Sequence, residues 1–536
     1  MNHTPEMNHT SETGKTPETE NTPEKAAVKK RGKPLKAIGI VVGVLLGLFA
    51  VSLGAVFPKQ REMTVELGGE VSQAPSDYLF GYPFIIDSAD VDTGGVITDK
   101  VGDYQTTARL LFYHYTFDVR VRDTTPPEIV PLADELYIAS GRDYRPDDFM
   151  EQARDLSGKT ECRIAYGGKT YDTISFPVQG KYRLTLEAED ASGNVGTREI
   201  DFTVDDPPVI IGAFDRHLPV GTDFDVASVA AVDTGDGNLT NKIQIERGGF
   251  DPDREGNYTV TYTVADSHGL ATEKTVTYSV CQKEKLALYS DDLSLGGDEL
   301  KLLCDADYFA YEPLAAPDFD KAVKLLEPTL VDLKVVWENA WIAGSGCIYK
   351  ITPDYVCFLS VKHVMVEVYK KCAVMFFDGT VVKGKVDYVY SKTYNELAMF
   401  MIPTADIPTD TLMKLRQVYV DPDIYNKLQK DDEVVAYAKH WIGSDEDLVK
   451  KMKVKRLTTS IRELNLYRSL LETTTGVVDG MSGTAVVDLR GNLVGLASAI
   501  GLDSESTRAF SAYHSKIDVI PEVEAYLEEK KTDSAA

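Results

Sequence analysis

Alternating apolar and polar residues mark most of the chain between residues 62 and 282. From Tyr258 the sequence reads YTVTYTV, turns at DSHG and continues as TVTYSV, a period-two pattern typical of paired strands. A Gly-x-Tyr motif opens such a strand at Gly102, Gly180 and Gly256, which are 78 and 76 residues apart. This repeat length predicts small antiparallel β-sandwiches in tandem. The predicted modules are residues 62–123, whose pattern is weaker, 124–206 and 207–282, with paired prolines after Asp123 and Asp205 at the two boundaries.

A second run of short apolar segments begins at residue 330 and continues to about 525. No helical pattern alternates with these segments, so they predict an antiparallel β-barrel class rather than a parallel α/β sheet. Residues 283–329 are mixed and predict a connector with an amphipathic helix from Phe319 to Glu327.

The N-terminal pattern is different. Residues 1–36 are polar and repetitive, which predicts a disordered tail ending in a Lys/Arg cluster. Residues 37–57 contain no charged side chain and as a helix would span about 30 Å, the thickness of a bilayer core. The basic cluster predicts a single-pass cell-membrane protein with a cytoplasmic N-terminus and extracellular C-terminal domains. A cleaved signal peptide is the alternative, which the long preceding tail disfavours.

The amino-acid composition limits the classes of molecule that the protein is expected to bind. The 536 residues carry a formal net charge of −27, which argues against nucleic acid. Six scattered cysteines fit neither a disulfide scaffold nor a zinc site, and Cys347 and Cys357 are either buried thiols or a pair across a hairpin. The acidic run Asp233, Asp236 and Asn238 is explained either by Asx turns or by a calcium loop, and the turns are the simpler reading. We therefore expect no metal and no cofactor.

The candidate chemistry lies near Ser482, in the segment Gly480-Met-Ser-Gly. A serine between glycines can present a free hydroxyl beside convergent backbone N–H groups, as an acyl-transfer nucleophile requires, although many turns share this composition. A nucleophilic serine also needs a base and a group that orients the base. His363 ends an apolar strand and Glu396 begins another, whereas positions in loops or on the surface suffice to explain the two other histidines of this region, His440 and His514.

Six segments in this order resemble trypsin-like serine proteases, most closely the HtrA/Deg-type bacterial branch. They cover about residues 330–520 and are GSGCI, FLSVKHVM, FFDGTVVKGKVDYVYSKTYNELAMF, DEVVAYA, KVKRLTTSI and VDGMSGTAVVDLRGNLVGLASAI. The second and third modules are similar to bacterial immunoglobulin-like and HYR-type repeats. No PDZ-like segment follows residue 525, unlike most of that branch. The resemblance implies a double antiparallel β-barrel of the trypsin-like type.

The same resemblance implies roles for individual residues. Ser482 corresponds to the nucleophile, His363 to the general base and Glu396 to the orienting carboxylate, which is aspartate in the family. The N–H groups of Gly480 and Ser482 correspond to the oxyanion hole. Thr484 stands where the family has a second glycine. The residues expected to bind substrate are Thr475, Gly476, Ala497, Ser498 and Ala499.

Two functions follow as hypotheses. The first is a membrane-anchored serine endopeptidase that cleaves proteins or peptides outside the membrane, with a homo-oligomer as one of its expected partners. The pocket position Gly476 carries no carboxylate, so cleavage after Lys or Arg is not expected. The second, favoured by Glu396 and Thr484, is a catalytically inactive protease fold that acts with its repeats as a surface binding or sensing module.

Overall fold

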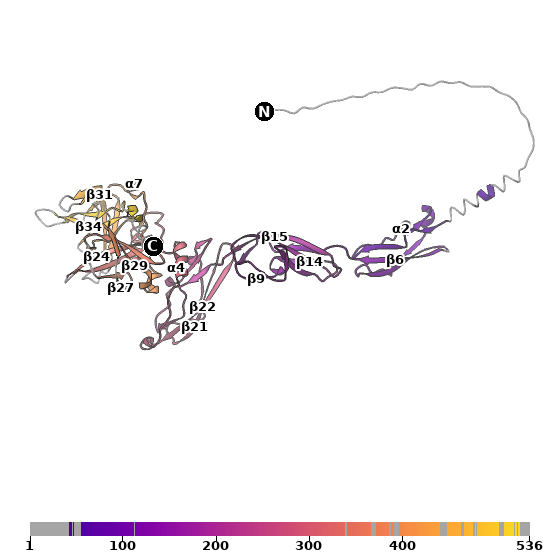
Figure 1. The fold of residues 1–536 in the computed structure, drawn as a ribbon, viewed down its shortest axis with the longest axis horizontal. Helices are drawn as coiled ribbons and strands as arrows, with labels where there is room; N and C mark the ends of the chain where they lie inside the picture. The colour runs from indigo at the N-terminus through magenta and orange to yellow at the C-terminus, as the bar shows by residue number, and fades with distance from the viewer. Residues whose placement is uncertain are drawn as a thin grey trace, which may run out of the picture. The chain divides into compact units, whose positions relative to one another are not determined.

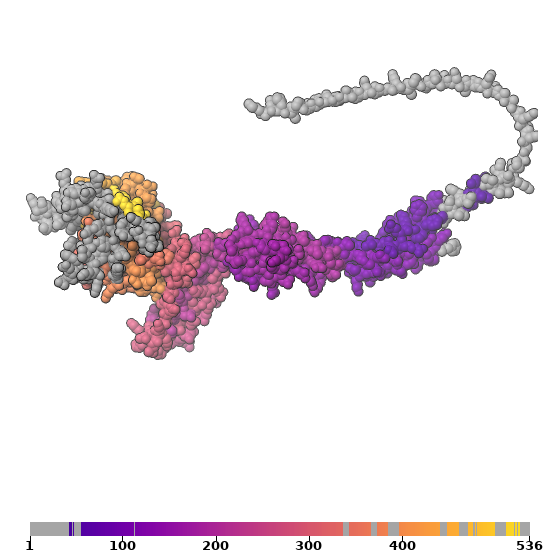
Figure 2. All heavy atoms as spheres, in the orientation of Figure 1, coloured from indigo at the N-terminus to yellow at the C-terminus, as the bar shows by residue number. Residues whose placement is uncertain are grey.

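The computed structural model describes most of the chain from residue 55 onward, drawn in colour in Figures 1 and 2. The chain divides into two units, one comprising 1–129, 153–161 and 188–196, the other 130–152, 162–187 and 197–536. The described residues are 42–45, 47, 55–111, 113–337, 340–365, 371–384, 387–390, 396–439, 447–461, 466–474, 477–478, 480–502, 509–518, 520–522 and 524–525.

The predicted membrane helix lies mostly outside these residues. Of residues 37–57, the structure describes 42–45, 47 and 55–57, and the tail 1–36 is not described. Among the described residues, no helix combines the length and apolar character that crossing a bilayer requires.

The first repeat forms a four-stranded sheet in the order β2-β6-β5-β4. Its inward positions, including Phe117 and Val119 on β6, are fully buried, as the alternating pattern predicts. The elements of this region are β1 (Phe57–Pro58), β2 (Glu62–Glu66), α2 (Pro75–Tyr78), β3 (Leu79–Phe80), α3 (Pro83–Ile86), β4 (Asp90–Asp92), β5 (Gly102–Leu110) and β6 (Tyr113–Arg122).

The second repeat contains a five-stranded sheet in the order β12-β11-β14-β15-β8 and two strand pairs, β7 with β10 and β9 with β13. Its elements are β7 (Glu128–Pro131), β8 (Tyr137–Ala139), β9 (Asp143–Tyr144), η1 (Pro146–Asp148), β10 (Met150–Arg154), β11 (Glu161–Tyr166), β12 (Lys169–Tyr171), β13 (Ile174–Ser175), β14 (Gly180–Glu189) and β15 (Val195–Asp205).

The third repeat packs a three-stranded sheet, β16-β18-β19, and a four-stranded sheet, β17-β22-β21-β20, around an aromatic core that includes Phe224 and Tyr278. The long strands β21 and β22 lie side by side in Figure 1. The elements are β16 (Val209–Ile211), β17 (Arg216–Pro219), η2 (Val226–Ser228), β18 (Ala230–Asp233), β19 (Gly237–Asn238), η3 (Thr240–Lys242), β20 (Gln244–Glu246), β21 (Gly256–Ala265) and β22 (Ala271–Cys281).

The expectation of purely antiparallel sandwiches is wrong in one respect that recurs in every repeat. A short early strand pairs parallel with the last long strand: β2 with β6, β8 with β15, and β17 with β22. Parallel neighbours need a long crossover connection rather than a hairpin, and here the rest of each repeat supplies that connection. Alternation within a strand does not encode which distant strand becomes its neighbour.

The Gly-x-Tyr motif has a common structural reason in all three repeats. Each tyrosine hydroxyl donates a hydrogen bond to the carbonyl oxygen four residues earlier, at 3.0, 2.8 and 2.9 Å for Tyr104, Tyr182 and Tyr258. The ring folds back over the motif's glycine, so that a Cβ at Gly102 would lie 3.1 Å from the ring atoms of Tyr104. The corresponding distances at Gly256 and Gly180 are 3.4 and 3.7 Å, so the contact is tight only at Gly102, while the tyrosine hydrogen bond is common to all three turns.

The connector is helical in part, as expected. Helix α5 (Phe319–Leu326) begins after Asp318, whose carboxylate accepts the N–H of Lys321, and it is followed by η5 (Glu327–Thr329). The remaining connector elements are η4 (Lys283–Leu288) and α4 (Gly297–Asp305).

The C-terminal region contains two antiparallel sheets rather than two closed barrels. The first is a seven-stranded sheet in the order β27-β26-β23-β24-β25-β29-β28, with no closing pair among the described residues. Its elements are β23 (Leu330–Trp337), β24 (Ala340–Ile351), β25 (Tyr355–Val361), β26 (Lys371–Phe376), β27 (Val381–Gly384), β28 (Asp387–Tyr390) and β29 (Leu397–Pro403).

The second sheet closes into a barrel in the order β30-β31-β32-β35-β34-β33. Three short helices, η6 (Thr404–Asp406), α6 (Thr409–Leu412) and α7 (Ile424–Lys427), precede it. The strands are β30 (Glu433–Ala438), β31 (Leu448–Ile461), β32 (Leu466–Thr474), β33 (Ala485–Asp488), β34 (Leu493–Leu502) and β35 (Ala509–Ser515).

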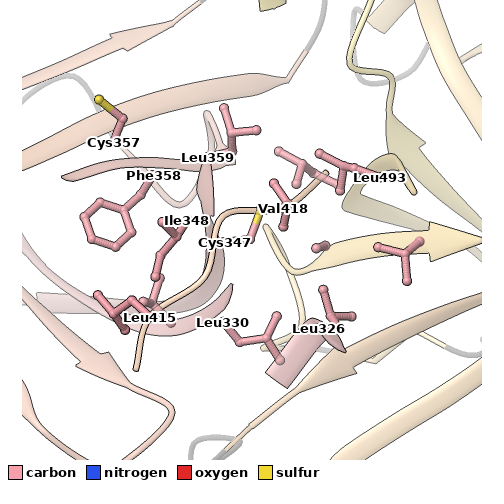
Figure 3. Packing of buried hydrophobic residues seen from close by; sticks show 14 of the residues in the cluster. Leu326, Leu330, Cys347, Ile348, Cys357, Phe358, Leu359, Leu415, Val418 and Leu493 are labelled. Atoms are coloured by element: carbon pink, nitrogen blue, oxygen red, sulfur yellow. The ribbon is translucent and has the colours of Figure 1, made fainter. Parts of the chain in front are cut away.

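One hydrophobic cluster joins the connector to both C-terminal sheets. Figure 3 shows Leu326 of α5, Cys347 of β24 and Leu493 of β34 among its buried side chains. Cys347 lies opposite Leu359 in the strand register and Cys357 lies opposite Lys350, so the two thiols do not face each other across the hairpin. Cys281, Cys304, Cys347 and Cys372 are free thiols.

Candidate active site

His363 and Glu396 are brought together by the pairing of β25 with β29. The register places Val361 opposite Leu397, and the N–H of Lys362 donates to the Glu396 carbonyl oxygen at 2.6 Å. His363 therefore leaves one strand where Glu396 enters the other. Their separation of 33 residues along the chain is closed by an antiparallel ladder.

The Glu396 carboxylate holds the histidine by both its ring and its backbone. Oxygen Oε2 lies 2.9 Å from His363 Nδ1 and accepts the His363 backbone N–H at 3.1 Å. An ionised carboxylate only accepts hydrogen bonds, so the proton of a neutral imidazole lies on Nδ1 and Nε2 is left as the acceptor. A general base needs this tautomer.

Exposure and charge support an ionised Glu396. Its side chain is 18% exposed and that of His363 is 45% exposed. Burial alone would raise the pKa of Glu396, but the hydrogen bonds and charge of His363 outweigh burial and bring the pKa below its usual value.

Ser482 lies in a turn whose shape depends on two glycines. Gly480 and Gly483 have φ of +90° and +92°, in the left-handed region that favours glycine. The N–H of Met481 donates to the Val478 carbonyl at 3.1 Å. Neither the N–H of Gly480 nor that of Ser482 has a hydrogen-bond acceptor among the described residues.

Strand β24 fastens this turn from the neighbouring sheet. The N–H of Ser345 donates to the Ser482 carbonyl at 2.7 Å, and the Ser345 hydroxyl donates to the Gly480 carbonyl at 3.2 Å. These bonds keep both carbonyl oxygens engaged, so that they do not compete for the N–H donors of the turn.

Gly344 provides the contact between the serine turn and the histidine turn. A Cβ at Gly344 would lie 2.6 Å from the Val364 methyl groups and 3.0 Å from the Ser482 carbonyl oxygen. Val364 follows His363, so both turns pack against this one glycine. No hydrogen bond joins the His363 ring to the Ser482 hydroxyl within the described part of the chain.

Thr484 occupies its position without a left-handed backbone. The described non-glycine residues with positive φ are Leu111, Asp307 and Asp431, and Thr484 is not among them. Its side chain is buried and its hydroxyl donates to the Tyr437 carbonyl.

The position that requires glycine is Gly483. A Cβ there would lie 2.1 Å from the Ser345 carbonyl oxygen and 2.4 Å from the Ser360 hydroxyl. Thr484 thus anchors the turn to the barrel through its hydroxyl. The residue that must be glycine is Gly483, one position before it.

The residues expected to bind substrate lie partly on β34. Both polar backbone groups of Ala497 are used by the serine turn, because its N–H donates to Thr484 and its carbonyl accepts from Gly483. Ladder pairing with β33 runs only from Leu493 to Leu496. Ser498 and Ala499 follow on the side where β33 has ended. Thr475 and Gly476 lie outside the described residues.

One titratable side chain near this region, Asp332, was not singled out from the sequence. Asp332 on β23 is opposite Ser345, and burial, with a smaller contribution from Asp447, raises its pKa to about 7. The exposed Lys334 lies two residues further along the same strand, so strand alternation alone does not predict that Asp332 is buried.

The histidines that do not approach Glu396 have other settings. His514 is fully buried, its Nε2 lies 2.8 Å from the Thr473 hydroxyl, and burial lowers its pKa to about 3. The expectation that a loop or surface position explains His514 is therefore wrong, because the residue lies within β35 and its ring is enclosed in the barrel. His440 lies outside the described residues.

Comparisons with known proteins identify one module and several resemblances. Residues 209–280 match the family described as bacterial surface protein, Ig-like domain. An uncharacterized 81.3 kDa protein of Acholeplasma phage L2 is 28% identical over 203 residues, which cover 35% of this chain and 27% of the phage protein.

Solved structures of HtrA-type proteases resemble part of the chain. The HtrA-type protease AlgW with tripeptide shares 20% identity, with a TM-score of 0.33, over 40% of this chain and 65% of that one. The serine endoprotease from Yersinia pestis shares 19% identity, with a TM-score of 0.30, over 40% of this chain and 68% of that one. These scores are too low to assign the fold, so the case for the site rests on its own geometry.

Proposed function

We propose that this chain is a serine endopeptidase in which Ser482, His363 and Glu396 form the catalytic triad within a trypsin-like domain. The observation that carries the proposal is that one Glu396 oxygen accepts two hydrogen bonds from His363, one from the ring Nδ1 and one from the backbone N–H. A surface histidine does not need such a restraint, whereas a general base does, because its ring must stay oriented while it gains and loses a proton.

In the proposed reaction, the Ser482 hydroxyl oxygen attacks the substrate carbonyl carbon while its proton moves to His363 Nε2. Glu396 stabilises the resulting imidazolium through Nδ1–H. The N–H groups of Gly480 and Ser482 would receive the negative oxygen of the tetrahedral intermediate. His363 then protonates the leaving amine, and water hydrolyses the acyl-enzyme by the same steps.

A peptide substrate would be positioned on β34. The edge that begins at Ser498 extends beyond the last residue paired with β33, so an extended peptide can add there as a further strand. Thr475 and Gly476 remain the proposed pocket residues, with a small or medium apolar side chain as the expected occupant.

The proposed location is the outer face of a cell membrane, anchored through residues 37–57. The uncharged stretch after a basic cluster supports the anchor, and the bacterial surface match over residues 209–280 supports the extracellular side. Protein or peptide substrates outside the membrane are the proposed partners, and a homo-oligomer is compatible with this arrangement.

One observation favours the alternative, a catalytically inactive protease fold used for binding or sensing. No hydrogen bond connects Ser482 to His363 among the described residues. Free enzymes often have long catalytic distances that shorten with substrate, so the endopeptidase remains the better supported function.

A fluorophosphonate probe applied to the full chain distinguishes the two functions. We expect labelling of the wild type, loss of labelling in Ser482→Ala, and unchanged labelling in Ser294→Ala, a serine of an exposed turn. Absence of labelling in a wild type whose fold is verified by circular dichroism would exclude the endopeptidase.

A further inference from the structure

Three aspartates from two successive repeats meet in the first unit. One carboxylate oxygen from each of Asp123, Asp155 and Asp190 lies within 4.8 Å of the other two. Asp123 ends the first repeat, Asp155 follows β10, and Asp190 opens the turn between β14 and β15. Asp123 and Asp190 are both 7% exposed. Burial together with these two like charges raises the pKa of Asp123, so the carboxylates repel one another.

The second unit repeats this arrangement one module later. Asp205 ends the second repeat and Asp266 opens the turn between β21 and β22, the places that Asp123 and Asp190 occupy one repeat earlier. Ligand atoms of Asp205, Asp266 and His268 lie within 4.8 Å of one another. The two clusters therefore occupy corresponding positions in the repeats.

Unpartnered oxygen atoms distinguish the second cluster from a set of ordinary turns. Asp266 is 8% exposed, and its Oδ1 accepts the His268 N–H at 2.8 Å, but its Oδ2 is buried without a hydrogen-bond partner among the described residues. The Oδ2 atom of Asp233, which is 6% exposed, is buried and unpartnered in the same way. Asp233 precedes Asp266 by 33 residues, much as Asp155 precedes Asp190 by 35.

A buried carboxylate oxygen without a hydrogen-bond partner destabilises the folded state. Leaving a buried acceptor unsatisfied typically costs about 1–3 kcal/mol, and more when the group is charged. The turn N–H groups already bind the opposite oxygen of Asp266, so the local backbone does not satisfy Oδ2. A bound cation would satisfy it and offset the repulsion between carboxylates.

We propose that calcium binds at the second cluster through Asp205 and Asp266. The first cluster differs, because Asn194 Nδ2 donates to Asp190 Oδ2 and the Ser192 hydroxyl donates to Asp123 Oδ2, so these carboxylates already have hydrogen-bond donors. Hard divalent cations prefer carboxylate oxygens, and the unpartnered atoms are oxygens. His268 Nδ1 lies 2.9 Å from Asp205 Oδ2 and orients that carboxylate as a hydrogen-bond donor, so it is not a ligand. The inference does not depend on the proposed protease activity.

Calcium at the second cluster links the end of the second repeat to a turn of the third. The cluster offers few protein ligands, so water completes the coordination, and the dissociation constant is expected on the order of 10⁻⁴ to 10⁻³ M. Ordering of the repeats is therefore expected to depend on calcium concentrations typical of extracellular fluids.

The full chain, stripped with EDTA, provides the test. Calorimetric titration with calcium is expected to give one site per chain, and calcium is expected to raise the melting temperature of the wild type. Terbium, which occupies calcium sites, reports on the second cluster through Tyr137, whose ring stacks on His268 with 3.9 Å between ring centroids. Calcium should displace the sensitised terbium emission.

Two substitutions make the test specific. Asp266→Asn keeps the Oδ1 acceptor of the turn and removes the charge, so calcium affinity at the second cluster should fall about tenfold or more. Asp251→Asn, in an exposed Asx turn of the same repeat, is the matched control and should bind like the wild type.

Each contrary result overturns the proposal. No calcium or terbium binding by the wild type excludes the site, and zinc binding without calcium assigns the imidazole as a ligand instead. Equal weakening by Asp251→Asn shows general charge screening. The calcium-dependent melting temperature of the wild type decides the matter if a variant does not fold.

Discussion

The repeats and the C-terminal sheets place their polar chemistry in different ways. In the third repeat, Asp266 accepts N–H groups two and four residues further along, so one turn determines the position of the carboxylate. At the candidate active site, Glu396 reaches His363 across 33 residues, and Ser345 binds the Ser482 carbonyl across 137. A carboxylate held by its own turn can recur in every repeat. The candidate active site, in contrast, forms only when several strands that are distant in the sequence pack together.

Glycines show the same difference. A Cβ at Gly269, in the turn of the third repeat, would meet no atom within 4 Å, although its φ is +84°. Gly483 has a similar φ, yet a Cβ there would lie 2.1 Å from the Ser345 carbonyl oxygen. The first glycine is required by its turn alone, and the second is required by its turn and by a strand from another sheet.

The largest expected effect is that of Glu396→Gln on catalysis. The neutral amide cannot stabilise the imidazolium, so kcat should fall by about 10³–10⁴-fold with the fold intact. Hydrolysis of a fluorogenic peptide by the full chain measures this. Glu273→Gln, at an exposed position of β22, should leave kcat unchanged, and a Glu396→Gln variant as active as the wild type would refute the orienting role.

Gly483→Ala and Gly269→Ala sharpen the comparison of the two turns. We expect Gly483→Ala to destabilise the C-terminal sheets by roughly 3–5 kcal/mol, since left-handed backbone and a clash add together, and Gly269→Ala to cost only about 1–2 kcal/mol in its repeat. Hydrogen exchange resolves the two regions in one chain. Equal losses of stability in the two variants would mean that Ser345 moves away to accommodate the added methyl group.

Asp332→Asn tests the buried carboxyl behind Ser345. Its ordinary pKa of 3.8 is raised to about 7 in the folded protein. Between these values the unfolded chain ionises while the folded chain keeps its proton, so stability is greatest below pH 4, falls as the pH rises to 7 and then levels off. The contribution is about 2–4 kcal/mol.

The measurement is chemical denaturation of the C-terminal sheets at several pH values. Asp332→Asn should flatten the decline between pH 4 and 7. Asp354→Asn, on an exposed turn of the same domain, should keep it. An unchanged slope in Asp332→Asn would show that another group controls the pH dependence.

The smallest expected effects compare two tyrosine hydroxyls. Tyr425 donates to the Val494 carbonyl at 2.7 Å and accepts the Ile517 N–H at 2.8 Å, so Tyr425→Phe should cost about 2–3 kcal/mol by leaving both groups unsatisfied. Tyr258→Phe loses one exposed bond, to the Arg254 carbonyl, and should cost less than about 1 kcal/mol. Hydrogen exchange of each region measures both losses of stability. A larger loss for Tyr258→Phe than for Tyr425→Phe would contradict the prediction.

The sequence by itself determined the mostly β character, the repeat positions and the order His363, Glu396, Ser482. The alternation of apolar and polar residues indicates which face of a strand is buried, and a glycine near a tyrosine or serine indicates a turn. Both properties depend on residues that are neighbours in the sequence. The Asx turns at Asp233 and Asn238 were also readable, and the structure contains them.

Only the tertiary structure decided which distant strands pair. It made the early strand of each repeat parallel to the last, left the seven-stranded sheet without a closing pair among the described residues, and closed the second sheet into a barrel. It also directed the Thr484 hydroxyl to Tyr437 and left Asp266 Oδ2 without a partner. These features depend on contacts between residues far apart in the chain, and a local pattern of side chains does not specify them.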